Sequence, residues 1–360
     1  MFPHNVSLIA EHTASKRLVL ASAFLLLALV GLFAADLLLG TVGIPAKVVW
    51  SALLGGREME EKYRILILES RLPRAITAIL GGAALATCGL LMQTFFRNPV
   101  AGPYILGISS GASLGVALLL LGQGSAGLLA HWASGAAPGV VMAASGGAAL
   151  TMGAMLLLAT RVRDPATLLV FGLMMGSFTG ALVSLLQYQA DAASLRDFVY
   201  WTFGSLDHTH WQELGLLAPL LGGCFGLGWL LSGRFDLLAL GDDYARSMGL
   251  AVNFTRAIAI VLTALMAGAV TAYCGPISFI GVAVPHAVRA LSGRTSHLVL
   301  WPLCALGGAV LLLACDLISR MPGMDATLPI NAVTALVGAP AVAAIVWRMR
   351  RISSFFQSGA

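Results

Sequence analysis

The sequence predicts an all-α, polytopic membrane protein with about ten transmembrane helices. Hydrophobic residues make up 58% of the 360 residues and charged residues only 10%, and the mean hydropathy is +0.89. A soluble domain carries about 25% charged residues, so this chain lacks the polar surface that water requires. Apolar runs of about 20 residues recur along it, which is the length that a helix needs to cross the hydrocarbon core.

The apolar runs place the spans in order along the chain. They cover residues 18–39, 74–95, 103–122, 137–160, 166–188, 212–232, 254–273, 277–291, 298–318 and 329–347. The third and eighth runs are rich in Gly and Pro and are expected to be short or broken helices. Lys16 and Arg17 precede a first run that is too long for a signal peptide, so this run is interpreted as a span. The predicted organisation is a tail at 1–17, a membrane domain at 18–347 and a second tail at 348–360.

Positively charged residues set the predicted orientation. With the N-terminus inside, thirteen of the 21 lysines and arginines fall in inner segments and eight in outer segments. The cluster Arg348-Met-Arg-Arg351 follows the last span. We therefore expect both termini and the loop 233–253 inside, with residues 41–73 and 189–211 outside. No cluster of Lys and Arg has the form of a nucleic-acid footprint.

Small residues and cysteines indicate packing rather than chemistry. Gly107, Gly111 and Gly115 repeat at helical spacing, and such spacing lets helix backbones approach closely in lipid. The five cysteines lie in or beside apolar runs without any CxxC pair: Cys88, Cys224, Cys274, Cys304 and Cys315. They are interpreted as small buried hydrophobes, and no metal site is predicted.

No catalytic constellation stands out among the ionisable residues. Asp36 and Asp316 lie near the outer ends of spans, and His286 follows Pro285 in the eighth run. Ionisable residues inside a membrane are functional candidates by default. Residues near helix ends also reach the interface, so a proton relay is the weaker interpretation.

Three segments carry alternative interpretations. Asn98-Pro99 with Gly102-Pro103 forms either a plain turn or a re-entrant element. Arg71 and Arg74 lie on the outer side, where they either snorkel to the interface or dock an acidic external partner. The polar loop 233–253 is either a connection or an element that fits a cytosolic protein. The chain holds no GxxxxGK[ST] loop, so if ATP powers it, another chain binds the nucleotide.

Motifs in a fixed order over residues 60–345 carry a resemblance. They are Arg71-Leu-Pro-Arg74, Gly81-Gly-Ala-Ala-Leu85, Gly89 with Gln93, Asn98-Pro-Val-Ala-Gly-Pro103, Leu106-Gly-Ile-Ser-Ser-Gly-Ala112, Trp201 with Phe203-Gly-Ser-Leu206, Leu240-Gly-Asp242 with Ala245 and Gly249, Gly275-Pro-Ile-Ser-Phe-Ile-Gly281 with Val284-Pro-His286 and Arg289, Asp316 with Arg320, and Leu328-Pro329 with Gly338-Ala-Pro340. With them the chain resembles the permease subunits of the iron-siderophore, haem and cobalamin uptake family of ABC transporters, the type II importers.

The resemblance implies a two-fold homodimer of ten-helix subunits around a central pathway in the cytoplasmic membrane of a prokaryote, embedded in lipid. It implies two cytosolic ATPase subunits that use ATP and Mg, an external binding protein that delivers cargo, and no cofactor or catalytic residue in this chain. Docking of the binding protein would fall to Arg71, Arg74 and Arg320. Coupling to the ATPase would fall to Gly241, Asp242, Ala245, Arg246, Met248 and Gly249. A cytoplasmic gate would lie in the loop 163–167, at Asp164, Pro165 and Ala166, and the pathway and structural positions would be Gln93, Asn98, Pro99, Pro285 and His286.

Departures from the family pattern fall at Thr327, Asn331 and Ala341, and they affect the expected contacts with the binding protein. Iron chelate is the expected cargo on family frequency, with cobalamin and haem as alternatives. Three residues near the outer mouth would favour haem: His208, His210 and Met321. The simpler interpretation is that they are exposed loop residues. An ion- or proton-coupled secondary transporter is the alternative function, and a membrane-embedded enzyme is a more distant one.

Overall fold

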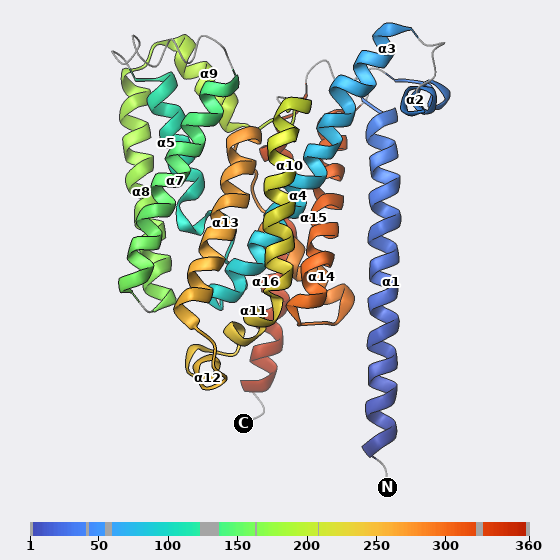
Figure 1. Ribbon diagram of the computed structural model, residues 1–360, viewed down its shortest axis with the longest axis vertical. Helices are drawn as coiled ribbons and strands as arrows, with labels where there is room; N and C mark the ends of the chain where they lie inside the picture. The colour runs from blue at the N-terminus through green and yellow to red at the C-terminus, as the bar shows by residue number, and fades with distance from the viewer. Residues whose placement is uncertain are drawn as a thin grey trace.

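The computed structural model describes residues 3–40, 43–54, 60–122, 137–162, 164–207, 209–321 and 327–357 (Figure 1). Within these ranges all regular elements are helical. Seven helices of the described chain are long and apolar enough to cross a membrane, and three shorter helices are also apolar. The predicted all-α, polytopic membrane fold is therefore confirmed.

The long helices are α1 (Pro3–Leu38), α4 (Leu72–Phe96), α7 (Ala137–Arg161), α8 (Pro165–Gln189), α10 (Trp211–Leu230), α13 (Val252–Cys274), α15 (His297–Ser319) and α16 (Ile330–Gln357). The shorter helices are α2 (Ala46–Leu53), α3 (Glu61–Ile65), the π-helical turn η1 (Leu66–Arg71), the 3₁₀ turn η2 (Pro103–Leu106), α5 (Ile108–Leu120), α9 (Ala192–Thr202), α11 (Ser232–Ala239), α12 (Asp242–Ser247) and α14 (Ile280–Ser292). Each of the predicted spans overlaps one of these helices.

The two Gly/Pro-rich runs form the short helices α5 and α14. Gly107 has a φ of 76° and separates η2 from α5, because glycine adopts this left-handed conformation without a steric cost. Gly275, at a φ of 72°, ends α13, and α14 begins only at Ile280. Helices α1 and α16 extend well beyond their predicted spans, since α1 begins at Pro3 and α16 continues to Gln357.

Helix α4 is the centre of the bundle. In its most apolar window 78% of residues are buried, against 11% for α1, which stands at the edge of the molecule in Figure 1. Helices α13, α14 and α15 pack along α4. Where α4 crosses α15, Gly82 lies against the carbonyl of Gly308, and a Cβ at either glycine would collide with the other backbone. These glycines permit the close approach that drives helix association in lipid.

The helices define two ends of the molecule (Figure 1). One end carries α12 and both chain termini, and we call it the α12 end. The other end carries α2, α3 and α9, and we call it the α2 end. The termini and the loop 233–253 therefore share one end, as the predicted topology requires. The assignment of that end to the cytoplasm stays a prediction.

Candidate functional site

A buried cluster of charged residues joins three helices at the α2 end. Arg74 of α4 donates to both carboxylate oxygens of Asp316 on α15, with Nε–Oδ1, Nε–Oδ2 and Nη2–Oδ1 distances of 3.0, 3.0 and 2.7 Å. Arg320 lies 2.6 Å from the second oxygen of Asp316 and also pairs with Asp36 of α1. The carboxylate of Asp316 is fully buried and faces two guanidinium groups. This geometry holds α1, α4 and α15 together at the α2 end.

The arginines expected to dock a binding protein are all buried. Arg71, Arg74 and Arg320 are 4%, 6% and 6% exposed. Arg71 donates to the Leu37 carbonyl over 2.7 Å, and Arg74 also pairs with Asp207, whose side chain is 46% exposed. The docking role stays a prediction. It requires a binding protein to reach arginines that are buried and already donate to acceptors inside the protein.

The structure describes two of the three residues considered for haem. His210 precedes α10, where its backbone N–H donates to Glu213 over 2.9 Å. Met321 is 50% exposed, and His208 lies outside the described residues. Among the described residues no group of three or more His, Cys, Asp or Glu could hold a metal ion.

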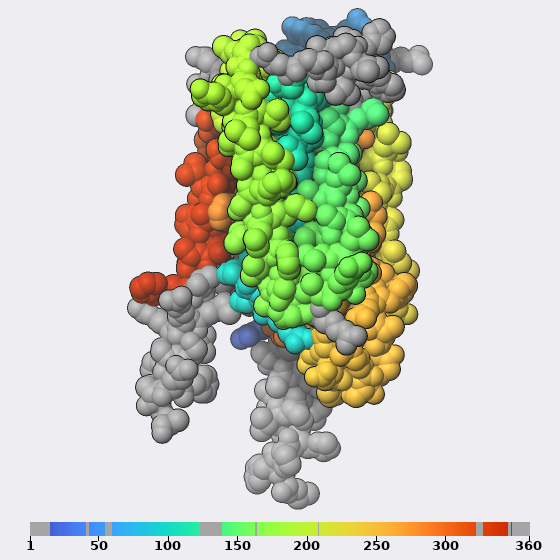
Figure 2. Space-filling view, turned by 90° about the vertical axis from the view of Figure 1, so that its left-hand side faces the viewer, coloured from blue at the N-terminus to red at the C-terminus, as the bar shows by residue number. Residues whose placement is uncertain are grey.

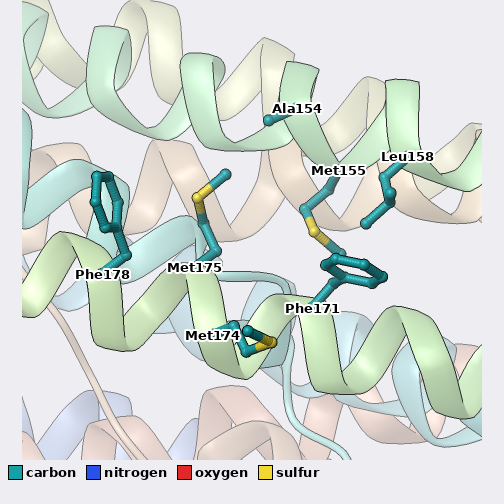
Figure 3. Close-up of a pocket in the computed structure, with 7 residues that line it drawn as sticks. All are labelled: Ala154, Met155, Leu158, Phe171, Met174, Met175 and Phe178. Carbon is teal, nitrogen blue, oxygen red and sulfur yellow. The ribbon is translucent and has the colours of Figure 1, made fainter.

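The exposed side of α7 and α8 is apolar and hollowed. Figure 2 shows this side, with α5 visible between the two helices. A cavity of about 380 Å³ is lined by Ala154, Met155, Leu158, Phe171, Met174, Met175 and Phe178. Figure 3 shows Met155 of α7 reaching toward Phe171 of α8. Methionine and phenylalanine give this wall an adaptable apolar surface without a charged group.

The segment expected to contact an ATPase forms α12 at one tip of the molecule. Its first residue, Asp242, faces inward. The carboxylate of Asp242 forms ion pairs with Arg97 at 2.8 Å and with Arg256 at 2.9 Å. Ala245 is fully buried, whereas the side chains of Tyr244 and Met248 are 53% and 58% exposed.

The remaining predicted coupling residues shape this segment. Gly241 and Gly249 have φ angles of 115° and 80°, so glycine allows the turns at both ends of α12. Arg246 lies 3.4 Å from Asp243 and 3.7 Å from Asp242. Asp243 and Arg246 are exposed, so the outward surface of α12 carries charged as well as apolar side chains.

The residues expected along the pathway meet at a junction between α4 and α14. Gln93 donates to the Val282 carbonyl over 3.3 Å and accepts from Arg289 over 2.6 Å. His286 contacts the Pro99 carbonyl at 2.6 Å, and Pro285 is buried within α14. The carboxamide oxygen of Asn98 accepts from the Val100 N–H and shapes the turn after α4. These contacts are structural, and a role in the pathway stays a prediction.

The residues expected to form a gate begin helix α8. Asp164 is the N-cap, Pro165 occupies the first helical position, and the Asp164 carboxylate accepts from the backbone N–H groups of Ala166 and Thr167. The Thr167 hydroxyl and N–H hold the pKa of Asp164 below its usual value. Arg163 lies outside the described residues, and gating by this loop stays a prediction.

A second polar group at the α12 end was not expected from the sequence. His297, at the start of α15, lies between Asp236 of α11, at 2.6 Å from Nδ1, and Thr94 of α4, at 2.7 Å from Nε2. Partial burial raises the pKa of Asp236, but hydrogen bonds from the side chain and backbone of His297 outweigh it and hold the pKa below its usual value.

Comparisons with known proteins decide the family. The profile of the FecCD transport family matches residues 2–348. The chain belongs to the FecCD transport family. The vitamin B12 import system permease protein BtuC of Salmonella paratyphi A is 38% identical over 288 residues, which cover 79% of this chain and 84% of that protein. The BtuC protein of Klebsiella pneumoniae subsp. pneumoniae is 39% identical over 299 residues, which cover 82% and 86%.

A solved structure of similar fold agrees with this membership. It is the inward-facing conformation of a transporter assigned to the metal-chelate type of ABC transporters, with a TM-score of 0.77 and 28% identity over 90% of this chain and 97% of that one. As a FecCD permease, the chain is the membrane-spanning component of an importer and is not itself the ATPase. The resemblance stated from the sequence motifs is confirmed.

Sequence reasoning identified some partners of the site residues and missed others. It singled out Asp36 and Asp316 as ionisable residues near span ends, and the spacing of Asp316 and Arg320 places them one helical turn apart. It did not single out His297, since one histidine at the start of an apolar run carries no pattern of its own.

Proposed function

We propose that the protein is the permease subunit of an ATP-driven importer that moves cobalamin, or a metal chelate of similar size, across the inner membrane. The similarity to vitamin B12 import permeases over most of both chains carries this proposal. It favours cobalamin over the iron chelate expected from family frequency. It also favours an importer over an ion-coupled transporter. The buried carboxylates Asp36 and Asp316 support the same choice, because both face arginines instead of standing free to carry protons.

The proposed ATPase contact is the exposed face of α12. Leu240, Tyr244 and Met248 are 63%, 53% and 58% exposed at the tip of the molecule. A helical tip that exposes apolar side chains in this way fits a groove on a cytosolic protein. The inward ion pairs of Asp242 hold the helix in place, so these exposed side chains are presented in one orientation. The proposal therefore has the α12 end in the cytoplasm, with both termini.

The proposed partner of the α7–α8 side is a second copy of this chain. In α8 the exposed residues Ser177, Gly180, Ala181 and Ser184 are small, and nothing within 4 Å would meet a Cβ at Gly180. Small residues permit close helix contact between subunits, and the apolar cavity beside them would then line a shared pathway. The mass of the purified protein in detergent tests this contact, because a monomer under all conditions would contradict it.

Affinity purification from native membranes tests the proposed function. The tagged chain is expected to bring an ATPase subunit at a one-to-one ratio, and ATP hydrolysis is expected to change when an external binding protein is added. The ligand of that binding protein then identifies the cargo. A chain that purifies alone and supports uptake in vesicles without ATP would contradict the proposal and favour a secondary transporter.

A further inference from the structure

Helix α11 is attached to α15 through one carboxylate. The Asp236 oxygen Oδ1 accepts from the His297 backbone N–H at 2.8 Å and lies 2.6 Å from His297 Nδ1. The second oxygen accepts from the Ser296 hydroxyl at 2.8 Å. The carboxylate therefore satisfies a backbone N–H at the start of α15 that has no acceptor within that helix. It binds the side chain of the same residue as well.

His297 extends this attachment to α4. The imidazole is 3% exposed, and its Nε2 lies 2.7 Å from the hydroxyl of Thr94 on the last turn of α4. Because a carboxylate only accepts, Nδ1 carries the proton toward Asp236. The Thr94 hydroxyl can either accept from Nε2 or donate to it, and it also lies 2.9 Å from the Leu90 carbonyl. The contact therefore persists in both protonation states of the ring.

Aromatic and ionic contacts support the same three helices. The ring of Phe235 stacks on Trp301 of α15, with 6.2 Å between centroids and 14° between planes. Arg97, the residue that follows α4, pairs with Asp242 of α12. The end of α4 is thus held by α15 through His297 and by α12 through Asp242. Helix α11 links the two attachments, since it leads directly into α12.

We propose that Thr94, His297 and Asp236 are positioning residues that transmit movement of α11 and α12 to the ends of α4 and α15 during transport. We call them the clamp. This inference rests on the proposed function, in which a cytosolic ATPase moves α12. Helix α4 passes through the centre of the bundle, and its other end carries Arg74 in the buried charged cluster. A displacement of α11 therefore reaches both ends of the protein through one rigid helix.

The test separates the two halves of the clamp. T94V removes the hydroxyl at nearly constant volume, whereas T94S retains it. H297N places an amide near the position of Nδ1 and retains the contact with Asp236, while it loses the contact with Thr94. The matched control is T255V on α13, because the buried Thr255 hydroxyl bonds only to the Ala251 carbonyl of its own helix among the contacts described.

The readout is the response of ATP hydrolysis to the external binding protein, measured in nanodiscs on the full transporter with its co-purified partners. Each response is divided by the basal hydrolysis of the same variant. T94V and H297N are expected to reduce the response about fivefold, which corresponds to the net free energy of one hydrogen bond. T94S and T255V are expected to retain the response. A purely structural role would lower thermal stability and yield without changing the response of the assembled complexes.

Two results would overturn the inference in distinguishable ways. A full response in T94V and H297N refutes the clamp and leaves the proposed function intact. A wild-type complex without ATP hydrolysis, or without any response to the binding protein, refutes the proposed function and the clamp with it.

Discussion

Removing the central carboxylate of the buried charged cluster is expected to destabilise the protein strongly. Asp316→Asn keeps the shape of the side chain but removes the charge that faces Arg74 and Arg320. Breaking a buried ion pair from one side costs about 3–5 kcal/mol. Arg74 keeps Asp207 and Arg320 keeps Asp36, so we expect the lower value, about 3 kcal/mol. Equilibrium unfolding in mixed detergent micelles measures this free energy.

Two further variants make the reasoning refutable. Asp207→Asn breaks an ion pair whose carboxylate is 46% exposed, and exposed pairs contribute only about 0–1 kcal/mol. The double variant R74M/D316L replaces both partners with apolar residues, which is nearly neutral for buried pairs, so it should recover most of the loss. An Asp316→Asn variant no less stable than Asp207→Asn, or a double variant that adds both losses, would refute the account of the cluster.

Three further predictions follow from packing, capping and the α12 surface. Gly308→Ala should cost about 2 kcal/mol of unfolding free energy because its Cβ meets the Gly82 carbonyl, whereas Gly146→Ala meets nothing within 4 Å and should cost none; equal losses would contradict the crossing. Asp164→Ala should lower the thermal stability at neutral pH. Because the pKa of Asp164 is depressed in the folded state, its contribution to stability is present above the unfolded pKa and is lost as pH falls through the folded pKa. The difference in stability from wild type should therefore vanish in acid. A difference independent of pH would argue against capping. Met248→Glu should weaken recovery of the ATPase about tenfold in a pull-down, and unchanged recovery would exclude the α12 face as the contact.

The membrane helices were predictable from the sequence because lipid imposes a simple rule. A spanning segment must satisfy its own backbone and present apolar side chains, so composition alone locates α4, α13 and α15. The Gly/Pro-rich runs were also predicted to be short, as α5 and α14 are. The helical ends of α1 and α16 beyond the apolar runs were not predicted, since hydropathy reports the membrane and not the length of a helix.

The contacts of the charged residues could not be predicted in the same way. The sequence places Arg74 and Asp316 242 positions apart, and only the crossing of α4 and α15 brings them together. An arginine at an outer helix end looks available for a partner until its internal acceptor is known. His297 illustrates the same limit, because its two neighbours come from α4 and α11.

ATP-dependent uptake tests the central claim most directly. The permease is reconstituted into liposomes with its co-purified ATPase and binding protein, and the uptake of radiolabelled cyanocobalamin is measured with ATP, without ATP and with an imposed ion gradient. The account predicts uptake only with ATP on the α12 side. Uptake driven by the ion gradient in the absence of ATP would contradict it. If cyanocobalamin is not carried but an iron chelate is, with the same dependence on ATP, the importer stands and the cargo is corrected.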